Sequence, residues 1–363
     1  MMEEVKAHAI LTDFLQAEGF KVERSYILPT AFKAIYYTQS DEPDVNACVI
    51  CEYDALPGVE HGCGHNLIAE AGLAAAIGIK AVIEIFPDVK LKLTVMGTPG
   101  EEGGGGKIKM LSKEAFKGID FAIMVHPANF NAIYPNVLSL NGMEITYTGK
   151  PAHAAAYPWE GVNALDAAVN AYSAVSMMRQ QFKPTWRAHG VFTDGGLKPN
   201  VIPDRAVLSY MIRAPNNAEL EQLMDKLEGC FNAGATATGC TVVINKSDIP
   251  YFDMRTNSIL AEIYRNNSME LGMTYPDIET DKAQSSFSTD MGNVSYEVPS
   301  IHPTYALNTT SVNHTTEFNL ASNTIESHEI TLIAGIAMAH TAIDVVFTDG
   351  VLIQVKEEFY KNK

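Results

Sequence analysis

The chain has 363 residues, a length that is long for one domain and sufficient for two. Hydrophobic residues make up 47% and charged residues 19%, which is typical of a globular protein and excludes extended disorder. The formal net charge of −17 opposes contact with phosphate backbones and with anionic lipid. We therefore expect neither nucleic acid nor a membrane as a partner.

The sequence shows no clear targeting or anchoring segment. We find no apolar run of about 18 residues, the length that a membrane-spanning helix needs. The first residues, MMEEVKAHAILTDF, are acidic and amphipathic, unlike a secretory signal peptide. The five cysteines are few and odd in number, which does not indicate a disulfide framework. We therefore expect a cytoplasmic protein.

The first part of the chain alternates between helix and strand patterns. Helical spacing of apolar residues predicts helices over 3–18 and over the Ala-rich segment 66–84. Apolar, β-branched runs predict strands at 45–51, 90–97 and 119–125. This alternation predicts an α/β fold with a mixed, largely parallel sheet.

The pattern changes near residue 140, where a second series begins. It comprises a strand, a helix at 161–181, strands at 187–193 and 205–213, a helix at 216–237 and a strand at 240–246. The order β-α-β-β-α-β is that of a ferredoxin-like unit. A helix at 256–271 and a final helix from about 325 then resume the first pattern. We therefore predict a discontinuous catalytic domain, residues 1–139 and 251–363, with a ferredoxin-like α+β lid or dimerisation domain inserted at 140–250.

The first candidate chemical group is the pair Cys63 and His65, which precedes the Ala-rich helix. A thiolate and an imidazole that are two residues apart, with only Gly64 between them, can both reach one cation. Alone the pair is weak evidence, because a single cysteine or histidine is more often structural.

Two adjacent carboxylates, Glu101 and Glu102, form the second group, in GTPGEEGGGG. Such residues are usually solvated loop charges. Alternatively, one ligates a metal while the other takes a proton from a water molecule that the metal makes more acidic. Two histidines, in FAIMVHPA and SVNHTTEF, are further candidates, although a structural role is the alternative for each. The combined set of nitrogen, sulfur and oxygen ligands suits zinc: Cys63, His65, Glu102, His126 and His314.

In these motifs the sequence resembles the aminoacylase–carboxypeptidase superfamily of co-catalytic metallopeptidases, peptidase family M20, and within it the amidohydrolase branch. The resemblance runs through EYDALPGVEHGCGHN, GTPGEEGGGGK, VHP, GKPAHAAAYPWEGVNALDA, GGLKPNVIPDRA, STDMGNVSYEVP and NHTTEF. It implies two divalent metal ions, zinc or manganese, held by the five candidate ligands. It further implies that Glu101 is the general base and that Asp54 of EYDALP steadies a ligand.

The resemblance also assigns three residues of the insert to the substrate. His153 of GKPAHAA would polarise the scissile carbonyl, while Asn200 of GGLKPN and Arg213 of YMIRAP would hold the substrate carboxylate. An arginine fork matches a carboxylate, and a cation aimed at the developing oxyanion lowers the barrier. The alternative for His153 is a turn residue without a chemical role. The resemblance also implies a homodimer that forms through the inserted domain.

The resemblance implies hydrolysis of the amide bond of a dipeptide by metal-activated water. A dipeptide with a C-terminal basic residue, of the β-alanyl-lysine type, is the leading substrate. Aminobenzoyl-glutamate or an N-acyl-amino acid is the alternative. Two positions depart from the family pattern: Asn66 stands where many acylases have Asp, and Glu52 where peptidase members have a ligating histidine. A catalytically inactive binding protein of the same fold is disfavoured, because the candidate ligands and the Glu101/Glu102 pair are complete.

Overall fold

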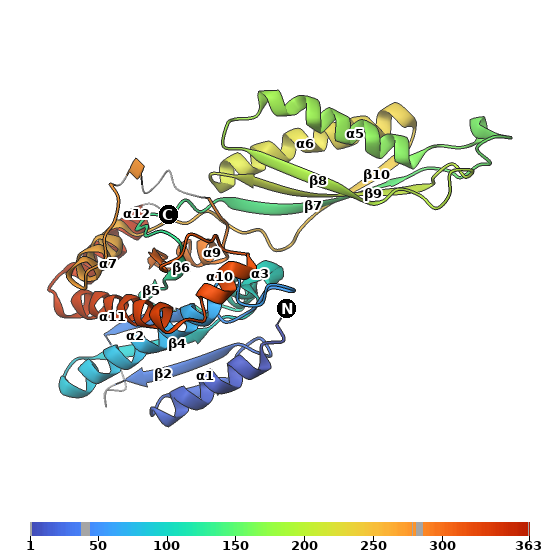
Figure 1. Ribbon diagram of the computed structural model, residues 1–363. Helices are drawn as coiled ribbons and strands as arrows, with labels where there is room; N and C mark the ends of the chain where they lie inside the picture. Colours follow the sequence, from blue (N-terminus) through green and yellow to red (C-terminus); the bar gives the residue numbers. More distant parts are fainter. Residues whose placement is uncertain (1, 38–43, 278, 281–285, 362) are drawn as a thin grey trace. The chain divides into compact units, whose positions relative to one another are not determined.

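The computed structural model describes residues 2–37, 44–277, 279–280, 286–361 and 363. The chain divides into two compact units (Figure 1). Unit 1 comprises residues 1–136 and 254–363, and unit 2 comprises residues 137–253. The boundaries that we expected for the insert lie a few residues inside those of unit 2.

Unit 1 is built on a six-stranded sheet. In spatial order its strands are β1 (Lys21–Arg24), β2 (Phe32–Tyr37), β4 (Leu91–Gly97), β3 (Val45–Cys51), β5 (Phe121–Ile123) and β11 (Ser300–Ile301). The last four strands run parallel to one another, whereas β2 pairs antiparallel with both β1 and β4. The predicted mixed, largely parallel sheet is confirmed, but the sequence did not predict the β1–β2 hairpin. A separate parallel pair joins β6 (His126–Ala128) to β12 (Thr304–Ala306).

Helices pack against both faces of this sheet. The described helices of unit 1 are α1 (Val5–Ala17), α2 (His65–Ile85), α3 (Glu101–Gly104), α4 (Gly106–Leu111), α7 (Ser258–Glu270), α9 (Met291–Ser295), α10 (Thr316–Ala321), α11 (Ile325–Phe347) and α12 (Val351–Lys361). The segment after the expected strand at 90–97 contains the short helices α3 and α4, although Glu102 and Gly103 within α3 have non-helical backbone angles.

The two faces of the sheet bury separate apolar cores. In β3, Val49 and Cys51 belong to the core that contains α1, α2, α7 and α11, whereas Cys48 and Ile50 belong to the core that contains α4 and α9. Cys48 and Cys51 therefore point to opposite faces and share no metal, as the period of two predicts. Burial raises the pKa of both thiols, that of Cys51 to about 12, so neither is a thiolate near neutral pH.

Helix α11 corrects one expectation from the sequence. It is long and apolar enough to cross a membrane by length and composition, so our expectation that no run reaches that length was wrong. Half of its most apolar window is buried, and it packs along α2, where the Gly335 backbone closely approaches Ala71. Here the apolar helix forms part of the core of unit 1.

Unit 2 has the β-α-β-β-α-β order that the sequence predicted. Its elements are β7 (Ser139–Thr148), α5 (Ala164–Met178), β8 (Arg187–Asp194), β9 (Arg205–Ala214), α6 (Asn217–Thr238) and β10 (Thr241–Lys246), with short 3-10 turns at Pro158–Glu160 and Arg179–Gln181. The sheet order is β10-β7-β9-β8, with every neighbouring pair antiparallel. Helices α5 and α6 cover one face of it (Figure 1). This arrangement confirms the ferredoxin-like insert.

Candidate metal centre

The candidate ligands of unit 1 follow the carboxyl ends of its parallel strands, the edge where open α/β sheets bind ligands. The loop after β3 leads to Cys63 and to His65, the first residue of α2. Glu102 follows β4 and His126 follows β5. His314 comes from a distant loop that precedes α10, and its backbone N–H donates to the carbonyl of Gly62. This edge therefore gathers side chains from four separate segments.

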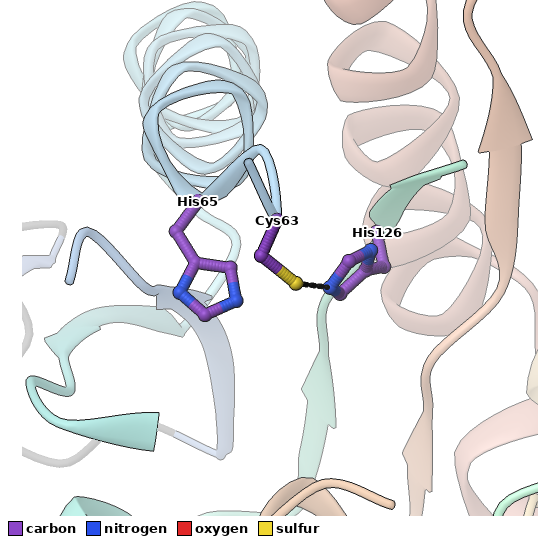
Figure 2. A group of neighbouring side chains, drawn as sticks. All are labelled: Cys63, His65 and His126. Carbon is purple, nitrogen blue, oxygen red and sulfur yellow. Dashed lines mark hydrogen bonds between the residues drawn. The ribbon is translucent and has the colours of Figure 1, made fainter. Parts of the chain in front are cut away.

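Gly64 allows Cys63 and His65 to approach the same point. Its φ is +82°, and a Cβ there would lie 2.6 Å from Cγ of Pro127. A side chain at position 64 would therefore be strained and would also clash. With glycine present, Cys63 Sγ lies 3.6 Å from His126 Nε2, and His65 stands on the other side of the sulfur (Figure 2).

Hydrogen bonds leave Nε2 of two histidines available to a cation. Nδ1 of His65 lies 3.1 Å from Oδ1 of Asp54, and since a carboxylate only accepts, Nδ1 is the donor. In the same way Nδ1 of His126 donates to the Pro127 carbonyl at 2.8 Å. In both rings Nε2 is therefore the nitrogen that a cation would bind once its proton is displaced, the arrangement typical of metal-bound histidine.

Asp54 links two ligand-bearing segments. Besides the bond from His65, its Oδ2 accepts a hydrogen bond from the backbone N–H of Glu102 at 3.0 Å. Burial alone would raise the pKa of Asp54, but these hydrogen bonds and the charge of His65 outweigh it and lower the pKa below its ordinary value. Asp54 is therefore ionised, as an acceptor for two donors must be.

Among the described residues, the ligand atoms form two three-residue clusters that share Cys63. One contains Cys63, His65 and His126, and the other contains Cys63, Glu102 and His314. Within each cluster the ligand atoms lie within 4.8 Å of one another, and Nε2 of His314 lies 3.1 Å from Oε1 of Glu102. Sulfur, nitrogen and oxygen donors at this spacing suit zinc and similar divalent ions.

The electrostatics of the clusters favour a thiolate. Burial would raise the pKa of Cys63, but the positive charges of His65 and His126 outweigh it and lower the pKa to about 5. The thiolate is the form that ligates a metal. Hydrogen bonds with Cys63 and Glu102 raise the pKa of His314 to about 10, so a cation that binds there displaces a proton.

Glu101 is buried beside the ligands and outside the two clusters that share Cys63. Its Oε2 lies 4.0 Å from Nε2 of His65. Burial and then the negative charges of Glu52 and Asp290 raise its pKa well above the ordinary value. A carboxyl group whose pKa is raised suits general base and acid chemistry. Glu101 also belongs to a third group of potential ligand atoms, with His65 and Glu102.

A fully buried ion network, which no sequence motif indicated, lies next to this site. The ammonium of Lys107 donates to Oδ1 of Asp290 at 2.8 Å and to Oε1 of Glu52. The Lys107 backbone N–H also donates to Oδ2 of Asp290. The other oxygen of Glu52 has no hydrogen-bond partner among the described residues and lies 3.6 Å from Nε2 of His65. The sequence had placed Glu52 where peptidase members have a ligating histidine, but it did not indicate that Lys107 and Asp290 lie beside it.

His302 is a second residue that the sequence analysis missed. It is 1% exposed, and its ring centroid lies 5.6 Å from that of His126 and 6.2 Å from that of Phe287. Burial and the neighbouring charges of His126 and Lys107 lower its pKa well below the ordinary value, so the ring is neutral. A signal was present, because His302-Pro303 repeats the His126-Pro127 pattern after a parallel partner strand.

The three residues expected to bind substrate all belong to unit 2. Nδ1 of the exposed His153 accepts from the backbone N–H groups of Ala155 and Ala156 at 3.3 and 3.2 Å, so a neutral ring carries its hydrogen on Nε2. The Asn200 carbonyl accepts from the Ala154 N–H at 3.1 Å, which brings the loops of His153 and Asn200 together. Arg213 lies near the end of β9 and is partly buried.

Comparisons with known proteins agree with this geometry. Residues 139–238 match the family model of the peptidase dimerisation domain. Xaa-Arg dipeptidase of Mus musculus is 44% identical over 365 residues, which cover 98% of this chain and 85% of that protein. One of the p-aminobenzoyl-glutamate hydrolase chains of Escherichia coli (strain K12) is 27% identical, over 98% of this chain and 88% of that protein.

A solved structure shares the fold. It is that of a Bacillus subtilis protein, a dinuclear metal binding peptidase, which matches with a TM-score of 0.69 and 16% identity over 95% of this chain and 93% of that chain. Together, the clustered metal-ligating side chains and the similarity along the whole chain define a metallopeptidase. The chain belongs to the M20 peptidase family.

Proposed function

We propose that this protein is a cytoplasmic metallodipeptidase that hydrolyses dipeptides with a C-terminal basic residue, of the β-alanyl-lysine type. The observation that carries the proposal is the pair of ligand clusters that share Cys63, with the buried carboxyl group of Glu101 beside them. The 44% identity with an Xaa-Arg dipeptidase supports the substrate class.

Two divalent ions, zinc or manganese, are the proposed cofactors. One would be held by Cys63, His65 and His126, and the other by Cys63, Glu102 and His314, so that the thiolate serves both. Bound at such a centre, divalent ions act as Lewis acids that polarise the scissile carbonyl and make a water molecule more acidic. Asp54 contributes by keeping the hydrogen of His65 on Nδ1.

Glu101 is the proposed general base. Its carboxylate takes the proton from the attacking water molecule and returns it to the departing amine, so one residue serves in both steps. Its buried position strengthens this role, because a desolvated carboxylate binds a proton more tightly than an exposed one.

The residues of unit 2 are proposed to bind the substrate. The Nε2–H of His153 would donate to the oxyanion that develops on the scissile carbonyl. Asn200 and Arg213 would hold the carboxylate of the C-terminal residue. The match to a peptidase dimerisation domain supports a homodimer as the working form.

Hydrolysis of p-aminobenzoyl-glutamate or of an N-acyl-amino acid is the second candidate function. It is supported by the match to a p-aminobenzoyl-glutamate hydrolase chain, which covers 98% of this chain at 27% identity. This substrate shares the amide bond and the C-terminal carboxylate, and it differs in the group at the amino end.

A substrate panel tests these functions. Protein reconstituted with zinc or with manganese is incubated with β-alanyl-lysine, a dipeptide ending in arginine, p-aminobenzoyl-glutamate and an N-acetyl-amino acid, and released amine is quantified. We expect the two basic dipeptides to have the highest kcat/KM. Preference for p-aminobenzoyl-glutamate or the N-acetyl-amino acid would favour the second function. Metal-loaded protein that cleaves none of them would indicate a binding protein.

A further inference from the structure

His302 is a buried polar residue that the proposed mechanism does not use. It directly follows β11, the parallel partner of β5, and β5 leads to the ligand His126. Neither of its ring nitrogens has a hydrogen-bond partner among the described residues. The imidazole is therefore buried beside the metal-ligating side chains, and none of the residues that the structure describes uses its hydrogen-bonding capacity.

No described residue satisfies this group, which leaves its nitrogens available to a ligand. A neutral imidazole has one N–H donor and one acceptor nitrogen, and native proteins pair nearly all buried polar atoms because an unpaired one is destabilising. Phe287 packs against both histidines, with its ring centroid 6.1 Å from that of His126 and 6.2 Å from that of His302. Phe287 is itself only partly buried, so the packing around His302 reaches the surface at this ring.

The chemistry of a dipeptide indicates which group this partner is. This step rests on the proposed function, in which Asn200 and Arg213 take the substrate carboxylate. The free amino group at the other end still needs an acceptor. The anionic side chains of the centre are engaged as ligands or as the base, and Glu52 pairs through one oxygen with Lys107 and faces Nε2 of His65 with the other at 3.6 Å. A ring nitrogen without a partner accepts a hydrogen bond from an ammonium group, while the face of Phe287 attracts a cation.

We propose that His302 is a further substrate-binding residue, which accepts a hydrogen bond from the ammonium group of the substrate's N-terminal residue. His302 then determines specificity, since it distinguishes dipeptides with a free amino group from N-acyl-amino acids, which have none. Phe287 lies against this group and covers it.

The test compares two substrates that differ only in that amino group: β-alanyl-lysine and propionyl-lysine. The variant His302→Phe keeps an aromatic ring of similar size and removes both nitrogens. We expect kcat/KM for β-alanyl-lysine to fall about tenfold or more, mainly through KM, because a hydrogen bond to a charged group is lost. The kcat/KM for propionyl-lysine, or its inhibition constant where it acts only as a competitive inhibitor, should change less than about threefold. Metal content should stay unchanged, and His302→Gln should restore part of the preference.

The outcome is decided by the ratio of the two kcat/KM values or, where propionyl-lysine acts only as an inhibitor, by the ratio of KM to its inhibition constant. The active fraction of a preparation affects neither ratio, even for a variant that folds poorly. His340→Phe, a change on the exposed face of α11, is the matched control and should leave the ratio unchanged. An unchanged ratio in His302→Phe, or an equal loss with both substrates, would overturn the inference and leave His302 as the partner of a buried water molecule. Wild-type protein that cleaves no dipeptide would instead overturn the proposed function.

Discussion

Single hydrogen bonds decide which atoms of the candidate centre can bind a cation. Asp54 keeps a hydrogen on Nδ1 of His65, and the Pro127 carbonyl does the same for His126, so both rings present Nε2. The carboxylate of Asp54 also holds the backbone of Glu102. The ligands are thus oriented by groups that do not themselves bind metal.

Glu101→Gln tests the general base. The carboxamide keeps the size of the side chain but cannot accept the proton, so we expect kcat to fall by about 10²–10⁴-fold, the contribution typical of general base catalysis. Metal content, measured by mass spectrometry, and the KM for β-alanyl-lysine should change little. Near-normal kcat in a variant that holds its full complement of metal would remove Glu101 from the mechanism.

Replacing the ligands tests the sharing of Cys63. Because Cys63 belongs to both clusters, Cys63→Ala should weaken the binding of both ions, whereas His126→Ala and His314→Ala should each affect one. Metal per chain is measured after dialysis against a fixed free zinc concentration. Cys230→Ala, at a buried cysteine in unit 2, is the control. Equal metal content in all four variants would refute the ligand assignment.

The candidate ligands could be predicted at the residue scale because each stands in a short motif of metal-binding residue types. His302 and Lys107 stand in no such motif, and their importance arises from burial and from neighbours distant in the sequence. The partners of Glu52 were likewise hidden, because Lys107 and Asp290 reach it from separate segments. Sequence patterns identify a residue's type and local spacing, whereas these interactions depend on the tertiary fold.

The longer elements were predicted well because their periodicity is strong. The expected helices over 66–84 and 216–237 correspond to α2 and α6, and the expected strand over 45–51 is β3. Strands β1 and β2 were not predicted, since β1 is only four residues long, charged and largely exposed, with no apolar alternation to mark it. The short α9 is fixed mainly by its packing against the sheet.

Two glycines of α6 test the contact between α5 and α6. A Cβ at Gly234 would lie 2.5 Å from the carbonyl oxygen of Ala167 in α5, whereas a Cβ at Gly229 would meet nothing within 4 Å. We expect Gly234→Ala to lower the free energy of unfolding by about 1–3 kcal/mol, because backbone cannot yield as a side chain does. Gly229→Ala should raise it by up to about 1 kcal/mol through helix propensity.

Urea unfolding followed by circular dichroism measures both variants. Because the two glycines lie on the same helix and undergo the same substitution, the difference between them isolates the close approach of α5. Equal effects of the two substitutions would show that α5 and α6 do not pack as closely as the structure indicates.

At the scale of the whole molecule, the functions proposed for the two units are complementary. Unit 1 holds the ligand clusters and Glu101, whereas unit 2 holds His153, Asn200 and Arg213. Neither unit alone therefore contains the full set of proposed groups. Unit 2 also contains the segment that matches a peptidase dimerisation domain, which raises the question of which copy supplies His153.

Mixing two inactive variants answers this question. His153→Ala lacks the oxyanion donor and Glu101→Gln lacks the base, so each should be nearly inactive alone. If one copy supplies His153 to the centre of another, a mixed dimer contains one complete site, so about half of the sites in mixed dimers recover by two-fold symmetry. Activity is measured after the chains exchange, with differently tagged variants to count mixed dimers.

The matched control replaces Glu101→Gln by the double variant Glu101→Gln/His153→Ala, which cannot restore either group to its partner. A recovered activity that appears with the single variant and not with the double variant would establish a site shared between copies. Mixed dimers that form and remain inactive would mean that each chain completes its own site. The recovered activity depends on the fraction of mixed dimers. When one variant is titrated against the other at constant total protein, the recovered activity should therefore be highest at equal amounts of the two.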